Sequence, residues 1–245
     1  MQKFLAYPLT IIYFLYFGLV LLIFHPIQWF CFNVLGYKAH KVSVIWLQFW
    51  IMRCLNILGT RFSINNPYEI DKNQPLIIVS NHQSMYDIPP ILWYFRRNHP
   101  KFISKKELGK GIPSVSYNLR HGGSVLIDRR KPIESIQAIE QFALRIKENN
   151  WAAVIFPEGT RSRDGNPKPF KTKGLIKLIE NIPNALVVPL TINNSWRTLK
   201  YGKFPMGLGA HVKFKVHEPF FINDFSKTEL LKKVEEEITN SITHD

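Results

Sequence analysis

Residues 76–90, Leu-Ile-Ile-Val-Ser-Asn-His-Gln-Ser-Met-Tyr-Asp-Ile-Pro-Pro, join an apolar run to a polar turn and a second apolar run. The first run predicts a buried strand, which ends at Ser80. His82 and Asp87 follow it closely, and Pro89-Pro90 suits the first turn of a helix that begins near Asp87. A strand, a polar turn and a helix in this order are typical of α/β domains.

The chain after residue 59 continues this alternation of strands and helices. Further strands are predicted at 125–127, 152–156 and 186–192, at 212–216 from its strict alternation, and at Phe102-Ile103. Apolar residues recur at helical spacing between Ile133 and Ile146 after Pro132, and Ser226 with Glu229 forms a capping box before a last helix. We therefore expect residues 59–245 to form an α/β domain, with a mixed, largely parallel sheet flanked by helices.

Residues 1–58 have a different composition. Residues 4–24 are 21 consecutive uncharged residues, and a helix that crosses a membrane needs roughly 20. A signal peptide would need small residues at a cleavage site, where this chain has bulky ones, and a buried soluble helix would be shorter. Tryptophans in residues 42–58 suit the bilayer interface. We expect a two-helix membrane anchor with Gly36 near its turn; the sequence leaves open whether the first helix crosses the bilayer or lies in one leaflet.

The charge of the chain favours anionic partners. Its 32 Lys and Arg residues against 18 Asp and Glu residues give a formal net charge of +14, which suits anionic lipid, phosphorylated substrates or nucleic acid. Cys31 and Cys54 are the only cysteines, and both lie in the predicted anchor. Because they form no disulfide framework, we expect the α/β domain to face a reducing cytoplasm.

His82 and Asp87 are the first candidate site residues. On one continuous helix they would point about 140° apart, so they can meet only if the chain turns between them. If they meet, the carboxylate can fix the imidazole tautomer of a general base. The alternative is purely structural, with His82 ending a strand and Asp87 capping a helix. A metal site is not expected, because no third ligand follows at suitable spacing.

Two other predicted strands are followed by cationic loops. Residues 122–130 contain two glycines and two arginines, and Lys105-Lys106 lies upstream of them. Residues 156–162, Phe-Pro-Glu-Gly-Thr-Arg-Ser, place a proline, a glycine and Arg161 directly after a strand, and an arginine fork suits a phosphate group. A nucleotide-binding P-loop is excluded, because its Gly-x4-Gly-Lys-Ser/Thr pattern is absent from the sequence.

These blocks together resemble the glycerolipid acyltransferase family, most strongly its 1-acyl-glycerol-3-phosphate (lysophosphatidic acid) acyltransferase branch. The resemblance rests on Asn81-His82 with Asp87, on Gly-x-x-x-Ile-Asp-Arg at 123–129, on residues 156–162, and on Val188-Pro189. All four blocks occur in the family's order within residues 60–220. The second block has Val125-Leu126 where the family often has an aromatic residue.

The resemblance implies acyl transfer from a thioester, either acyl-CoA or acyl carrier protein, to a glycerol hydroxyl. His82 would then be the general base and Asp87 its orienting partner, while Arg161, Lys105 and Arg129 would hold the acceptor's phosphate. The remaining residues of the implied substrate site are Glu158, Gly159 and Thr160. The acceptor hydroxyl replaces the serine of a hydrolase triad, so no acyl-enzyme, cofactor or metal is expected.

Other functions are consistent with parts of the sequence. A strained Gly-x-Ser-x-Gly turn does not surround Ser84, which argues against a serine nucleophile. A different lipid acceptor, or water in a thioester hydrolase, could take the place of lysophosphatidic acid. A nucleic-acid-binding protein fits the charge, but the cations are scattered over loops and an apolar anchor is present. A non-catalytic membrane scaffold is the third alternative.

Overall fold

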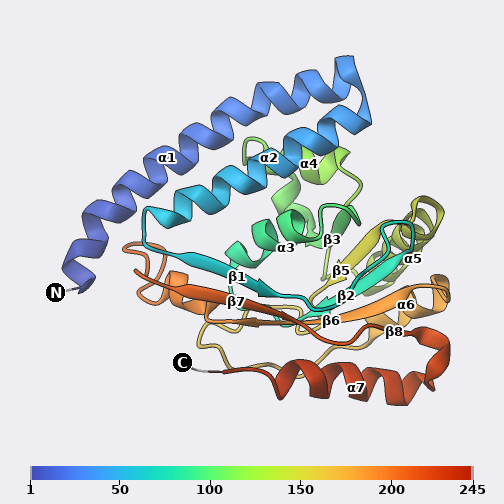
Figure 1. Cartoon of the computed structure of the whole chain (residues 1–245). Helices are drawn as coiled ribbons and strands as arrows, with labels where there is room; N and C mark the ends of the chain where they lie inside the picture. Colours follow the sequence, from blue (N-terminus) through green and yellow to red (C-terminus); the bar gives the residue numbers. More distant parts are fainter. Residues whose placement is uncertain (1, 244–245) are drawn as a thin grey trace.

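The computed structural model describes residues 2–243 and begins with two long helices. Helix α1 (Gln2–Phe30) continues into a short π-helix (Cys31–Leu35), and α2 (Tyr37–Asn56) then runs back along α1. Gly36 lies at the turn with a φ of 86°, a backbone conformation that favours glycine. The predicted position of the turn is therefore confirmed (Figure 1).

Most of the apolar side chains of the first helix are exposed to its surroundings. The continuous helix Gln2–Leu35 has a mean hydropathy of 2.1 and is long and apolar enough to cross a membrane. Only 22% of the most apolar 18-residue stretch of this helix is buried within the structure, so the helix differs from the core helix of a soluble domain. Among residues 2–243 it is the one helix that meets this criterion, and α2 does not.

The rest of the chain forms an eight-stranded sheet in the order β1-β7-β6-β2-β5-β3-β4, with β8 beside the start of β6. The five strands from β6 to β4 are parallel to one another, whereas β6 pairs antiparallel with both β7 and β8. The strands are β1 (Arg61–Asn65), β2 (Leu76–Ser80), β3 (Pro100–Lys105), β4 (Val125–Ile127), β5 (Ala152–Ile155), β6 (Leu186–Asn193), β7 (His211–Val216) and β8 (Phe220–Phe221). The prediction of a mixed, largely parallel sheet is thus confirmed.

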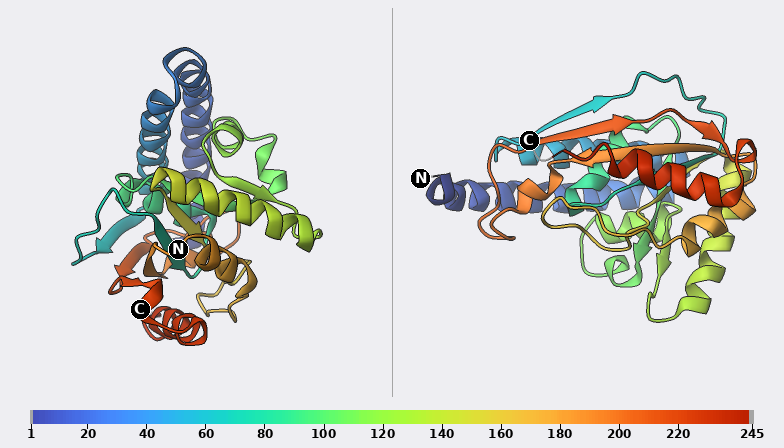
Figure 2. Two further views of the ribbon diagram at one scale, coloured as in Figure 1. Left: turned by 90° about the vertical axis from the view of Figure 1, so that its right-hand side faces the viewer. Right: turned by 90° about the horizontal axis from the view of Figure 1, so that it is seen from below.

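Helices cover both faces of this sheet (Figures 1 and 2). Helix α3 (Ile88–Tyr94), α4 (Val115–His121) and the α1–α2 pair lie on one side, and α5 (Pro132–Asn149), α6 (Lys173–Asn181) and α7 (Lys227–Thr239) lie on the other. Alternate residues of β2 point to opposite faces. Leu76 and Ile78 pack in the core beneath α3, while Ile77 and Val79 pack against α5, α6 and α7. Strand β2, the apolar run at the start of residues 76–90, therefore contributes to the core on both faces of the sheet.

A third hydrophobic cluster joins the two N-terminal helices to the α/β domain. Tyr13 of α1 and Leu47 of α2 pack with Tyr86 and with Met206 from the loop before β7. The boundary predicted at residue 58 stays a prediction, and the two parts are in direct contact across it. Sequence patterns did not identify β1, β8, α4 or α6, which are short elements near the edges of the sheet or on its surface.

Candidate active site

The candidate site lies where the parallel strands end. Because β2, β3, β4, β5 and β6 run in the same direction, their carboxyl ends meet at one edge of the sheet. The loops that follow are 81–87, 105–107, 128–130, 156–162 and 194–198. Every residue that sequence analysis assigned to a site is in one of these loops or at the last position of its strand.

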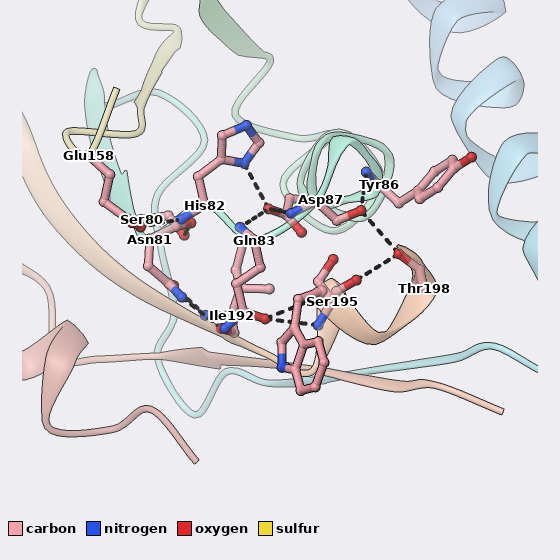
Figure 3. A network of polar contacts seen from close by, with 12 residues as sticks. Ser80, Asn81, His82, Gln83, Tyr86, Asp87, Glu158, Ile192, Ser195 and Thr198 are labelled. Atoms are coloured by element: carbon pink, nitrogen blue, oxygen red, sulfur yellow. Dashed lines mark hydrogen bonds and ion pairs between the residues drawn. The ribbon is translucent and has the colours of Figure 1, made fainter. Parts of the chain in front are cut away.

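His82 and Asp87 do meet. The imidazole Nδ1 lies 2.8 Å from the Asp87 Oδ2, and the side chain of Asp87 is fully buried while that of His82 is 16% exposed. The His82 ring stacks on Phe156 with a centroid distance of 4.1 Å and an interplanar angle of 15°. Figure 3 shows the second ring nitrogen, Nε2, directed away from the carboxylate. This arrangement presents one free nitrogen of an oriented imidazole at the strand edge.

The turn between these residues is held by Asp87 itself. Its Oδ2 also accepts hydrogen bonds from the backbone N–H groups of Gln83 at 2.8 Å and Ser84 at 2.9 Å. The hydroxyl of Ser84 accepts from Tyr86 N–H, and the resulting 3₁₀ turn (Met85–Asp87) leads directly into α3 with prolines in its first turn. Asp87 therefore caps the 3₁₀ turn and pairs with His82 at the same time, whereas at the start of α3 its side chain makes no capping hydrogen bond.

Glu158 connects the 156–162 loop to the histidine. One carboxylate oxygen accepts the backbone N–H of His82 at 2.7 Å, and the other accepts the N–H of Lys168 at 3.0 Å. In the opposite direction, the N–H of Ser162 donates to the His82 carbonyl at 2.7 Å. Burial raises the pKa of Glu158, while these hydrogen bonds oppose the rise. Glu158 thus fixes the backbone of the candidate base, and its predicted part in substrate binding stays a prediction.

The predicted phosphate-binding cations are arranged differently from one another. Arg161 is half-buried, its guanidinium makes no hydrogen bond or ion pair within residues 2–243, and its charge lies close enough to Tyr86 to act on that hydroxyl. Arg129 is exposed and donates to the Gly159 carbonyl. Lys105 is exposed at the end of β3. Arg161 is therefore the cation best placed to bind an anion beside His82.

Gly159 and Thr160 form the tip of the same loop. Gly159 has a φ of 70°, so a side chain at this position would strain the turn. Thr160 is exposed, and its side chain makes no hydrogen bond in the described part of the chain. Their predicted part in substrate binding stays a prediction.

Three contacts that hold the site were not identified from the sequence. The side-chain amide of Asn81 pairs with both backbone groups of Ile192, at 2.8 and 2.7 Å, as a neighbouring strand would. Gln83 accepts the N–H of Ser195 at 2.9 Å, and Ser84 lies 3.1 Å from the Thr198 hydroxyl. Figure 3 shows Asn81, Gln83, Ile192, Ser195 and Thr198 around the turn. Residues 194–198 are a mostly polar run directly after β6, as polar residues follow the other parallel strands. This pattern could have indicated that Ser195 and Thr198 lie near the site.

A cavity of ≈ 290 Å³ opens beside the turn. It is bordered by Met85 and Tyr86 at the candidate site and extends between α2, α3, β3 and α4. Stacked rings connect His82 to the cavity: His82 stacks on Phe156, which stacks on Phe102, and Phe102 lines the cavity. Lys41, Gln48, Arg96 and Lys101 also border it, but most of the surface that lines it is apolar. The large apolar residues of this lining are Phe17, Val44, Ile45, Ile51, Ile88, Leu92, Leu108, Ile112, Val115 and Leu119. A largely apolar cavity of this kind suits a hydrocarbon chain.

The metal prediction concerns the same region. Among residues 2–243, no group of three or more His, Cys, Asp and Glu side chains is placed to hold a metal ion. The expectation that catalysis needs no metal stays a prediction.

Comparison with known proteins agrees with this geometry. The family profile described as "Acyltransferase" matches residues 61–193, more than half of the chain, and the range includes His82, Asp87 and the 156–162 loop. The chain therefore belongs to the acyltransferase family.

Relatives with specific names extend the comparison. The chain is 27% identical over 205 residues to a 1-acyl-sn-glycerol-3-phosphate acyltransferase of Borreliella burgdorferi, covering 80% of each. It is 32% identical over 130 residues to a protein of that name from Limnanthes douglasii, covering 52% of this chain and 44% of the plant protein. The chain thus spans less than half of that longer relative.

A solved structure resembles nearly the whole chain. The crystal structure of the 1-acyl-sn-glycerophosphate (LPA) acyltransferase PlsC from Thermotoga maritima superposes with a TM-score of 0.81 at 27% identity. The match covers 98% of this chain and 95% of the Thermotoga chain, so it includes the two N-terminal helices as well as the sheet.

Proposed function

We propose that this chain transfers a fatty acyl group from a thioester to the free hydroxyl of 1-acyl-glycerol-3-phosphate, producing phosphatidic acid. The observation that carries the proposal is the His82–Asp87 pair, 2.8 Å apart, with its free Nε2 at the same sheet edge as Arg161. Membership of the acyltransferase family and the printed names of the relatives support this acceptor.

The geometry supports direct transfer. His82 Nε2 removes the proton of the acceptor hydroxyl, and the oxygen forms a bond to the thioester carbonyl carbon. The carbon–sulfur bond then breaks, and the imidazolium returns its proton to the leaving thiolate. Asp87 holds the other ring nitrogen and stabilises the positive charge that forms on the imidazole. Each bond that breaks is matched by one that forms, and no protein nucleophile takes part.

Arg161 would bind the acceptor's phosphate. Its guanidinium has no protein partner in the described residues, and charge-assisted hydrogen bonds to phosphate are the strong ones. Lys105 and Arg129 extend the positive charge to the loops after β3 and β4. Gly159 and Thr160 shape the same loop, and Glu158 holds it against His82.

Lipid substrates require access from a membrane, and helix α1 supports such access. Its exposed apolar surface suits the hydrocarbon region of a bilayer, and α1 packs directly on Tyr86 of the catalytic turn. We propose that residues 1–58 hold the chain on the inner face of the cytoplasmic membrane, with the sheet in the cytoplasm. The cavity beside Met85 would hold an acyl chain during transfer.

The experiment that tests the proposal is an acceptor panel with purified protein, followed by mass spectrometry. Acyl-CoA and acyl carrier protein thioesters are each supplied with lysophosphatidic acid, other lysophospholipids, 1-acylglycerol or no acceptor. We expect an acylated product, phosphatidic acid, with lysophosphatidic acid and none with the other acceptors. The His82→Ala variant should form no product. Thioester consumption without an acceptor would indicate a hydrolase, and no product from the wild type with any donor and acceptor would indicate a scaffold. Unchanged lipid synthesis by His82→Ala would refute His82 as the base. A DNA duplex that binds the protein in preference to anionic vesicles would favour the nucleic-acid alternative.

A further inference from the structure

The loop between β6 and β7 carries a short basic and aromatic segment outside the candidate active site. Residues 200–204, Lys-Tyr-Gly-Lys-Phe, are termed the 200–204 loop here. Lys200, Lys203 and Phe204 are exposed, and the Phe204 side chain is 52% accessible. A large apolar ring that follows two lysines and stays half exposed is not explained by burial within the chain.

This loop lies against the N-terminal half of α1 (Figure 1). Phe204 packs edge-on against Tyr7 with a centroid distance of 5.4 Å, and the N–H of Met206 donates to the Thr10 hydroxyl at 3.0 Å. The ammonium of Lys3 lies 5.9 Å from the centre of the Tyr201 ring. The position of the loop relative to α1 is thus fixed at three points.

Phe204 continues an apolar stripe of α1. Phe4, Tyr7, Ile11 and Leu15 are spaced by three or four residues, so they share one face of the helix, and all four are exposed. Phe204 touches this face at Tyr7. Any bilayer that covers the stripe therefore reaches Phe204 as well.

The charged residues of α1 and of the segment around Phe204 are all positive. Lys3 and Lys200 each place an ammonium within 6 Å of the Tyr201 ring centre, on segments almost 200 residues apart in sequence. Residues 1–68 and 194–217 contain no Asp or Glu. Within residues 2–243, Lys3, Lys200 and Lys203 form no ion pair with a carboxylate. Unpaired cations flanking an exposed ring are suited to the headgroup layer of an anionic bilayer.

We propose that the 200–204 loop is a second membrane contact, in which Phe204 enters the bilayer interface and Lys3, Lys200 and Lys203 bind anionic lipid headgroups. The inference rests on the proposed attachment of α1 to the membrane. The loop follows directly on residues 195–199, whose Ser195 and Thr198 hold Gln83 and Ser84 of the catalytic turn. The contact thereby places the catalytic edge of the sheet at the lipid surface.

The test uses the full chain in proteoliposomes with an environment-sensitive fluorophore on a single cysteine. In a Cys31→Ser, Cys54→Ala background, the cysteine is introduced as Phe204→Cys, Leu15→Cys or Phe221→Cys. Leu15 reports on α1, and Phe221, which is 49% exposed beside the start of β6, is the matched control at the opposite end of that strand. Phospholipids with nitroxide-labelled chains act as quenchers.

We expect at least threefold stronger quenching at residues 15 and 204 than at residue 221. Quenching at 15 with equal, weak quenching at 204 and 221 would overturn the loop contact while leaving the anchor intact. Weak quenching at all three positions would overturn the membrane attachment of α1 and the loop contact with it. Acyl transfer in neutral detergent micelles, measured on the same variants, tests the proposed reaction separately.

The headgroup assignment has its own comparison. Raising anionic lipid from none to 30% should at least double quenching at residue 204, and the double change Lys200→Gln/Lys203→Gln should abolish this increase. Lys147→Gln/Lys232→Gln removes the same charge from exposed positions on α5 and α7 and should have no effect. If the increase in quenching at residue 204 persists in the Lys200→Gln/Lys203→Gln variant, the assignment of these lysines to lipid headgroups is overturned. Tight DNA binding that is lost in the same variant would also overturn it.

Discussion

Replacing Asp87 by asparagine tests how the carboxylate serves the candidate base. Three donors converge on Oδ2: the Nδ1–H of His82 and the backbone N–H groups of Gln83 and Ser84, all within 2.9 Å. The other oxygen, Oδ1, is buried without a hydrogen-bond partner in the described residues. An asparagine can keep all three hydrogen bonds only with its oxygen at the Oδ2 position and its NH₂ group at the Oδ1 position.

The magnitude follows from this convergence. The reverse orientation would leave two buried N–H groups without acceptors, at a cost of about 1–3 kcal/mol each. The oxygen should therefore stay on His82, which keeps its Nδ1–H tautomer and a free basic Nε2. The variant then loses only the charge that stabilises the imidazolium, about 1.5–3 kcal/mol for a charge-assisted hydrogen bond, or roughly 10- to 150-fold in kcat. A serine-protease triad loses about 10⁴-fold because the equivalent change inverts the tautomer.

The assay is thiol release from acyl-CoA in mixed micelles containing 1-acyl-glycerol-3-phosphate, for the wild type, Asp87→Asn, His82→Ala and the double variant. The residual activity of Asp87→Asn should disappear when His82→Ala is added, because His82 still acts as the base. Thermal unfolding of each variant checks the fold, since the buried NH₂ group should cost about 1–3 kcal/mol. A loss of about 10³-fold or more with an intact fold would refute the reasoning and indicate an inverted tautomer.

Four further outcomes follow from the structure. Arg161→Ala should lower kcat/KM about tenfold or more for a phosphate-bearing acceptor, because each charge-assisted hydrogen bond contributes roughly 1.5–3 kcal/mol; an equal loss with 1-acylglycerol would contradict phosphate binding. Ser84→Ala should keep most activity while removing a cap worth about 0.5–2 kcal/mol in thermal unfolding, and acyl chain trapped covalently on the wild-type enzyme without acceptor would contradict direct transfer. Washing membranes with 1 M salt should leave the protein bound through α1, whereas detergent should release it; release by salt would indicate electrostatic attachment. Burial, with the nearby charges of Lys101, Lys41 and His40, lowers the pKa of His99 to about 2 from 6.5. Stability from this group is therefore present above pH 6.5 and is lost as the pH falls, so the wild type should lose about 2 kcal/mol more than His99→Asn between pH 7 and pH 5; asparagine tolerates the positive φ of 52° at this position, and equal losses would contradict the assignment.

Much of the candidate site could be predicted because its residues lie at the ends of apolar strands. A strand buried on both faces must be apolar throughout, so Leu76–Val79 and Ala152–Ile155 are recognisable without any neighbour. Parallel strands end at a common edge, so polar residues after each strand indicate one shared site. These two rules, with the family resemblance, account for the prediction of His82, Asp87 and Arg161 as residues of one site.

The order of the strands was not predictable in this way. β2 lies between β5 and β6, although β3 and β4 come next along the chain. This order brings Glu158 to the backbone of His82 across 76 residues of sequence, and Ile192 to Asn81 across 111. Apolar strands can pair with one another in many orders, and hydrophobic periodicity does not distinguish among them, because the choice depends on how all the helices and strands pack together.

By itself the sequence thus determined the apolar strands at the centre of the sheet, the apolar first helix, and His82 and Asp87 as a candidate pair, because each depends on residues close together in the chain. Only the tertiary structure decided which partners hold that pair. The convergence of three donors on one oxygen of Asp87, the buried bridge of Glu158 and the contact of Phe204 with Tyr7 all depend on the exact path of the backbone. Hydrogen bonds and ring contacts form within a few ångströms, and distances on that scale are set by packing between segments far apart in sequence.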